Sequence, residues 1–123
     1  MTDTHAPTAA LRSIAVAVDD TAAAEQLLAT LVDLPVTVRD GHRWTALDAG
    51  GLTLALTTAA ELPAGASVSI NVRVADVAAA YETLLAAGAQ SLSAPALGPH
   101  EERAAVLLGG CVALSVYRSV PAA

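Results

Sequence analysis

The feature of this chain that most constrains its fold is an internal repeat. Each half carries the same order of patterns: an alternating strand, an aspartate in front of an alanine-rich helix, and three further strands separated by turn residues. Ser13 in the first half aligns with Ser69 in the second, and Asp20 aligns with Asp76. The repeat therefore predicts an α+β fold made of two βαβββ units.

The expected elements follow from periodicity and from turn residues. Helices are expected over about residues 20–33 and 76–88, and Leu27, Leu28 and Leu31 share one face of the first helix. Residues 97–103 are expected to form a loop. Strands are expected over residues 11–18, 36–39, 42–49, 52–58, 68–74, 90–94, 104–108 and 111–118. This gives a flexible tail over 1–10 and one domain over 11–119, with halves at 11–58 and 67–119 joined by a linker at 59–66.

Two such units side by side form an eight-stranded, open, barrel-like sheet around a cleft. Each unit is a curved four-stranded sheet whose helix covers the outer face, so the concave faces enclose the cleft. Concave, preformed clefts are where small ligands bind. The pattern leaves open whether the cleft forms within one chain or between two chains that exchange halves.

Charge and composition exclude several classes of function. A net charge of −6 and a pI near 4.7, with no lysine, leave no clustered basic face for nucleic acid. No apolar run reaches the roughly 20 residues of a membrane span, and the first ten residues lack the pattern of a secretory signal. Cys111 is the only cysteine, which favours the reducing cytoplasm, and it is expected to be buried and inert.

Alternation along the strands selects the residues expected in the cleft. On the first, fifth and last strands, one face is apolar and is expected under the helices, whereas the other face carries small and polar residues. The polar residues of this second face, expected to bind a ligand, are Ser13, Ser69, Asn71, Arg73, Ser115 and Tyr117. Asn71 and Arg73 are the best polar contacts among them, although Arg73 equally fits a solvated position at the edge of the sheet.

Four further residues are candidates for ligand binding. Trp44, the only tryptophan, either stacks on a ligand or caps the core. His42 follows a hairpin turn, where a surface imidazole is the ordinary outcome. His100 and Arg103 belong to the charged loop that is expected to close over the cleft. A metal site in the His-Glu-Glu run that begins at His100 is disfavoured, because adjacent residues of an extended segment point to opposite sides.

Several strings in this order resemble the vicinal oxygen chelate superfamily, the class of glyoxalases, bleomycin-resistance proteins and extradiol dioxygenases. The strings VADVAAAYETLLAAGA and GPHEERAAVLL in the second half carry most of the resemblance. VAVDDTAAAEQLL and DGHRWTALDAGGLTLAL add to it, so that it covers about residues 11–118. The resemblance implies the open, barrel-like fold and no single activity, because this fold hosts many chemistries.

The resemblance also implies where a metal ion would bind. Metal-dependent members carry a His, Glu or Gln ligand on the first and last strand of each half, and the matching positions here are Ser13, Ala55, Ser69 and Ser115. Neutral hydroxyls are poor ligands for Zn²⁺, Fe²⁺ or Mn²⁺, and a methyl group is none. No metal and no other cofactor is therefore expected.

These observations predict a metal-independent protein that binds a small organic molecule, a drug or a secondary metabolite, as resistance members of the superfamily do. The alternative is an enzyme, a metal-free or atypical lyase, isomerase or cyclase, for which no catalytic residue can be assigned. Its candidate acid–base groups are Asn71, Arg73, His42, His100 and Glu102. A scaffold without a ligand is the third possibility. A homodimer is expected, because an open sheet leaves edge strands that a partner usually covers.

Overall fold

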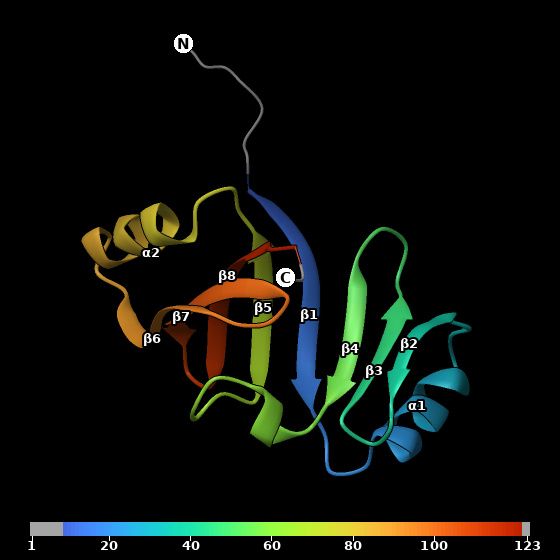
Figure 1. Ribbon diagram of the computed structural model, residues 1–123. Coiled ribbons are helices and arrows are strands. Elements are labelled where there is room, and N and C mark those ends of the chain that lie inside the picture. Colours follow the sequence, from blue (N-terminus) through green and yellow to red (C-terminus); the bar gives the residue numbers. More distant parts are fainter. Residues whose placement is uncertain (1–8, 122–123) are drawn as a thin grey trace.

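Two βαβββ units make up the computed structural model, which describes residues 9–121 (Figure 1). The first unit contains β1 (Ala10–Ala17), α1 (Thr21–Ala29), β2 (Val36–Asp40), β3 (Trp44–Asp48) and β4 (Thr53–Thr57). After the short 3-10 helix η1 (Ala59–Glu61), the second contains β5 (Val68–Arg73), α2 (Val77–Ala86), β6 (Gln90–Leu97), β7 (Glu101–Gly109) and β8 (Val112–Ser119). The predicted α+β fold is confirmed. Residues 1–8 of the predicted tail lie outside the described residues, and Ala10 already belongs to β1.

All eight strands form one open sheet in the order β2-β3-β4-β1-β5-β8-β7-β6. Within each unit, the first strand pairs in parallel with the last, β1 with β4 and β5 with β8. The units are joined by the antiparallel pairing of β1 with β5, which places Ser13 opposite Asn71 and Ala15 opposite Ser69. Both halves of the sheet, and the concave face between them, therefore come from one chain.

Both helices begin after the aspartates that the sequence identifies. The Asp20 carboxylate accepts a hydrogen bond from the Ala23 backbone N–H (3.1 Å), and the Asp76 carboxylate accepts one from Ala79 (3.0 Å). Each carboxylate satisfies a backbone donor that has no partner inside its helix. The two helices lie at opposite ends of the sheet (Figure 1).

α1 is shorter than predicted, since it ends at Ala29 and does not continue to residue 33. The Thr30 hydroxyl donates to the Leu27 carbonyl (2.6 Å), a local bond that competes with continuation of the helix. Leu31 therefore lies beyond the helix and is 90% exposed. Of the face formed with Leu27 and Leu28, only Leu28 is half-buried.

The core is best developed beneath α2, which contacts β6, β7 and β8. Val77 at the start of the helix is fully buried and packs with Val74, Ala104 and Val116. Val74 and Val116 belong to the apolar strand faces that alternation assigned to the helix side. In this half the predicted orientation of the strands is confirmed.

The segment predicted as a charged loop is largely strand. β6 extends to Leu97 and β7 already begins at Glu101, which leaves only three residues between them. Glu101 pairs with Ser119, and Arg103 pairs with Tyr117, in the ladder between β7 and β8. Backbone pairing with β8 outweighs the low strand propensity of the charged residues. Arg103 is therefore held in the sheet and does not belong to a loop that closes over the cleft.

Cys111 is exposed, so the expectation that it is buried is wrong. It forms, with Gly110, the two-residue turn between β7 and β8, and turn side chains project into solvent. Gly110 has a φ of 56°, the left-handed conformation that such a turn requires and that glycine adopts without strain. No helix within residues 9–121 is long and apolar enough to cross a membrane.

Two buried threonines on neighbouring strands differ in one hydrogen bond. Thr57 on β4 donates from Oγ1 to the Arg43 carbonyl, whereas Thr45 Oγ1 on β3 has no partner among the described residues.

We expect Thr45→Val to raise the free energy of unfolding by about 1 kcal/mol, because it removes an unsatisfied buried hydroxyl. The matched Thr57→Val should lower it by about 1 kcal/mol. Urea unfolding followed by Trp44 fluorescence measures both, and a change of the same sign in the two variants would contradict this explanation.

Exposed apolar side chains concentrate at one end of the molecule. Among residues 9–121, eight large apolar side chains are exposed, and five of them lie on α1, on β2 or between the two: Leu27, Leu31, Val32, Val36 and Val38. The ion pair between Arg39 and Glu25 (2.7 Å) holds β2 against α1, so these residues belong to one region. β2 is also an edge of the sheet, and exposed edges with apolar side chains favour pairing with another chain.

We predict that two copies of the chain associate through this region, with β2 at the interface. Light scattering at micromolar concentration should give twice the 12.3 kDa mass of one chain. Val38→Lys should produce monomers, because it places a charge on the exposed edge strand. Leu97→Lys, the matched control on the opposite edge strand β6, should remain dimeric. A native protein that scatters as a 12.3 kDa monomer would contradict the prediction.

Candidate functional site

A cleft of about 310 Å³ lies on the face of the sheet where the two units meet. The volume is at the lower end of the roughly 300–1,000 Å³ that small-molecule sites occupy. It is lined by strands of both units, by the end of η1 and by the two residues after it: Ala15, Trp44, Glu61, Leu62, Pro63, Ser69, Asn71, Ser93, Glu101 and Arg103. The site is thus built from residues that lie far apart in the sequence.

Four polar side chains form a hydrogen-bonded network at the base of the cleft, here called the polar floor. Asn71 Nδ2 donates to Ser13 Oγ (2.9 Å), and Asn71 Oδ1 accepts from Ser69 Oγ (2.8 Å). Ser69 Oγ lies 2.9 Å from Ser115 Oγ, and because a hydroxyl has one proton, Ser115 is the donor of that bond. Ser69, Asn71 and Ser115 are at most 4% exposed. The polar floor crosses the seam between the units, since Ser13 lies on β1.

Arg103 connects the polar floor to one wall of the cleft. Its Nη1 donates to Asn71 Oδ1 (3.3 Å), and its Nε donates to the Glu101 carboxylate (2.5 Å). The guanidinium also lies over the Tyr117 ring, 5.3 Å from its centroid. Three contacts therefore fix Arg103 in one position, and the amide carbonyl of Asn71 accepts two hydrogen bonds.

The opposite wall is more apolar. Trp44, at the start of β3, and Leu62, after η1, are both half-buried and line the cleft. Glu61 lies exposed at the same wall. Its carboxylate is near Arg43. The pKa of Arg43 is raised mainly by a hydrogen bond to Asp40, next by the negative charge of Asp40, and least by the negative charge of Glu61. The cleft therefore has one largely apolar, aromatic wall, which also carries Glu61, and one charged wall formed by the ion pair of Arg103 with Glu101.

Several of the predicted ligand-binding residues come together in this site. Ser69, Asn71, Trp44 and Arg103 line the cleft, and Ser13 is hydrogen-bonded to Asn71 directly beside them. Ser115 closes the polar floor from β8, and Tyr117 lies beneath Arg103. Strand alternation predicts that the serines and Asn71 share one face of the sheet, and their hydrogen bonds confirm it.

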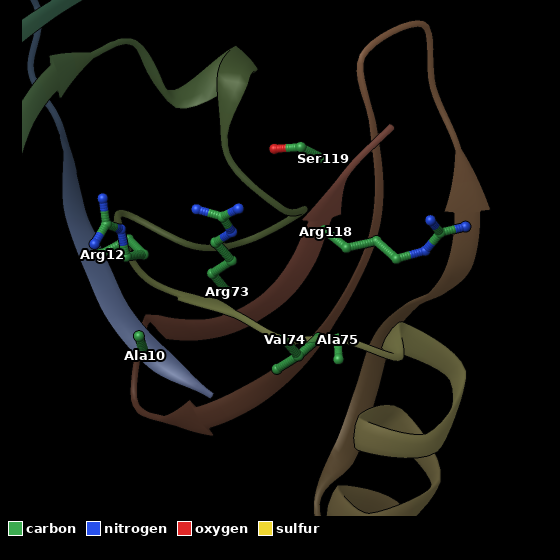
Figure 2. A pocket seen from close by; sticks show the side chains of 7 residues that line it. All are labelled: Ala10, Arg12, Arg73, Val74, Ala75, Arg118 and Ser119. Carbon is green, nitrogen blue, oxygen red and sulfur yellow. The ribbon is translucent and has the colours of Figure 1, made fainter. Parts of the chain in front are cut away.

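Three other candidates lie elsewhere among the described residues. Arg73 lines a separate pocket together with Arg12 (Figure 2) and does not line the cleft. His42 is exposed in the turn between β2 and β3, and His100 is exposed between β6 and β7. Neither histidine lines the cleft. The wall on the β7 side is formed by Glu101 and Arg103 and not by the preceding loop that contains His100.

The sequence did not identify the apolar residues that follow η1. Leu62 and Pro63 fall in the predicted linker, outside any strand, so alternation could not assign them to a face. Glu101 falls in the loop predicted over residues 97–103, although its position two residues before Arg103 is a usable signal. Residues two apart on a strand share a face, and these two form an ion pair.

A family model described as a glyoxalase-like domain matches residues 13–110 of the chain. The chain belongs to this glyoxalase-like domain family. An uncharacterized protein of Mycolicibacterium smegmatis is 40% identical over 68 residues, which are 55% of this chain and 59% of that protein. The alignment thus spans less than two thirds of the relative.

Solved structures agree with the glyoxalase-like assignment. A glyoxalase/bleomycin resistance protein/dioxygenase superfamily member from Vibrio splendidus has a TM-score of 0.71 at 14% identity, covering 90% of this chain and all of that one. Methylmalonyl-CoA epimerase from Mycobacterium tuberculosis has a TM-score of 0.64 at 16% identity, covering 98% of this chain and 94% of that one. At these identities the likeness shows the fold alone.

The residues at the expected metal positions of a glyoxalase-like domain do not fit a catalytic metal ion. Ser13, Ser69 and Ser115 are neutral and already hydrogen-bonded, Ser69 to Ser115 directly and to Ser13 through Asn71, and Ala55 has no donor atom. In the range 9–121, no group of three or more His, Cys, Asp or Glu side chains is placed to hold a metal. Zn²⁺ and Fe²⁺ prefer imidazole, thiolate and carboxylate donors. The polar floor is therefore a hydrogen-bonded structure built at the positions where metal ligands are expected.

Proposed function

We propose that this glyoxalase-like chain binds a small organic molecule in the cleft and uses no metal ion to do so. The observation that carries the proposal is the polar floor. Its hydroxyl and amide groups, all buried except the half-buried Ser13, are positioned by hydrogen bonds on both sides of the seam, next to a cleft of about 310 Å³. A few fixed polar groups at the base of a partly apolar cleft are typical of small-molecule sites.

The two walls indicate the chemistry of the ligand. Trp44, Leu62 and Pro63 suit a planar or apolar part of the molecule, since an indole ring stacks well on such groups. The lining carries two carboxylates, Glu61 and Glu101, and one guanidinium, which is already bonded to Glu101. This balance of charge favours a neutral or cationic molecule over an anion. A polar group of the ligand would reach Arg103 or the remaining N–H of Asn71.

We propose sequestration of a drug or secondary metabolite, in the cytoplasm, as the biological use of such binding. Sequestration requires affinity and no reaction, which suits a base of neutral hydroxyl and amide groups. The exposed thiol of Cys111 favours a reducing compartment, because there it stays free of disulfide exchange. Antibiotic resistance is the phenotype that this use predicts.

Trp44 makes the proposal directly testable, because the only tryptophan of the chain lines the cleft. Titration with a panel of small heteroaromatic amines should yield compounds that change Trp44 fluorescence and saturate at one per chain. Asn71→Ala should weaken such a compound about tenfold or more, because it removes a fixed polar contact worth roughly 1.5 kcal/mol.

Arg73→Ala is the matched control, since Arg73 lies on the same strand as Asn71 but outside the cleft lining. It should leave affinity unchanged. Thermal melts of both variants in the absence of ligand show whether the fold is kept, and Arg103→Gln provides a second cleft variant if Asn71→Ala unfolds. Equal affinity of the native protein and both cleft variants, for every compound that binds, would contradict the proposal.

A further inference from the structure

A second pocket, larger than the cleft, lies at the other end of β5. It has a volume of about 510 Å³ and is formed where the start of β1 and the ends of β5 and β8 meet (Figure 2). Its lining consists of Ala10, Arg12, Arg73, Val74, Ala75, Arg118 and Ser119. No residue lines both this pocket and the cleft. The lining includes three of the six basic residues of an acidic chain and, within the described chain, no acidic side chain.

A β-bulge in β1 brings Arg12 to this pocket. In the pairing of β1 with β5, Leu11 lies opposite Val72 and Ser13 lies opposite Asn71, so Arg12 is the extra residue. Strict alternation from Ser13 would direct Arg12 to the opposite face of the sheet. The extra residue breaks the alternation, and a bulge of this kind turns a side chain in a new direction. Arg12 therefore lies in the same pocket as Arg73.

The arginines of the pocket differ in what they contact. Arg118 Nε donates to the Glu102 carboxylate (2.7 Å), and its side chain leads away from the other two (Figure 2). The Arg12 and Arg73 side chains extend to one side of the pocket, and the Ser119 hydroxyl points toward the same space (Figure 2). Both arginines are exposed. The open part of the pocket thus presents two guanidinium groups and a hydroxyl.

The placement of these two guanidinium groups is unusual within this molecule. Arg39, Arg43, Arg103 and Arg118 each form an ion pair with a carboxylate. Within residues 9–121, neither Arg12 nor Arg73 contacts a carboxylate. Two neighbouring cations repel each other, and an anion between them relieves that repulsion. The bulge therefore creates a local concentration of positive charge on a chain whose net charge is −6.

We propose that the Arg12–Arg73 pocket binds the phosphoryl group of a small phosphorylated molecule. The planar guanidinium matches phosphate geometry with paired N–H donors, and Arg binds phosphate more specifically than a point charge does. A phosphate monoester carries close to two negative charges at neutral pH, which equals the charge of the two guanidinium groups. The Ser119 hydroxyl supplies a further donor. The remaining space, bordered by Ala10, Val74 and Ala75, accepts an organic group attached to the phosphate.

Calorimetric titration at low ionic strength tests this proposal with three probes: inorganic phosphate, phenyl phosphate and benzoate. Both phosphates should bind at one per chain, and benzoate, with one charge, should bind at least tenfold more weakly. If phenyl phosphate binds more tightly than inorganic phosphate, the ligand of the pocket is an organic phosphate. If inorganic phosphate binds more tightly, the ligand is the free phosphate ion. Either result supports a phosphoryl-binding site. The Trp44 fluorescence should stay unchanged in both cases, because Trp44 lies in the other pocket.

Arg12→Gln and Arg73→Gln should each weaken phosphate binding about tenfold or more, and the double variant should show no measurable binding. Arg12→Lys should lie between native and Arg12→Gln, because it keeps the charge and loses the paired donors. Arg39→Gln is the control for net charge and should bind as the native protein does. Absence of saturable phosphate binding in the native protein, native-like binding by the double variant, or an equal loss in Arg39→Gln would each overturn the proposal. All variants affect exposed side chains, and their folding is verified by thermal melts.

Discussion

The antiparallel pairing of β1 with β5 is the interaction on which the rest of the structure depends. A single βαβββ unit has one concave face with small and polar side chains, and this face alone does not form a cleft. The pairing sets two such faces next to each other within one chain and fixes their register, with Ser13 opposite Asn71 and Ala15 opposite Ser69. A shift of one residue would turn each of these side chains to the other face of the sheet. The cleft, the polar floor and the second pocket all follow from this register.

The polar floor joins the two units through hydrogen bonds between neutral groups. Burying an amide and two hydroxyls is costly unless their hydrogen bonds are made, and here Asn71 bonds to both units at once. A metal ion at such a site would connect the strands through charge. Here the connection is made by neutral groups that are hydrogen-bonded to one another in the absence of a ligand. The site is therefore preorganised, and binding needs to order few additional side chains.

Much of this organisation could be predicted from the sequence, because it depends on local rules. The aspartates before the helices, the apolar strand faces and the shared face of Ser69, Asn71 and Ser115 follow from capping and alternation. Three features depend on tertiary structure instead. The bulge that redirects Arg12 appears only when β1 is paired with β5. The inclusion of Arg103 in a strand depends on β8, and the contribution of Leu62 to the cleft depends on a segment without periodicity.

The central claim is that hydrogen-bonded hydroxyl and amide groups replace metal ligands at the base of the cleft. Elemental analysis tests it most directly. The protein is incubated with equimolar Zn²⁺, Mn²⁺, Fe²⁺ or Ni²⁺, desalted, and assayed for bound metal with and without prior EDTA treatment. The account predicts no stoichiometric retention of any of the four ions, because Ser13, Ser69 and Ser115 donate to or accept from neutral partners. Retention of one equivalent per chain, removed by EDTA and abolished by Ser69→Ala, would contradict it.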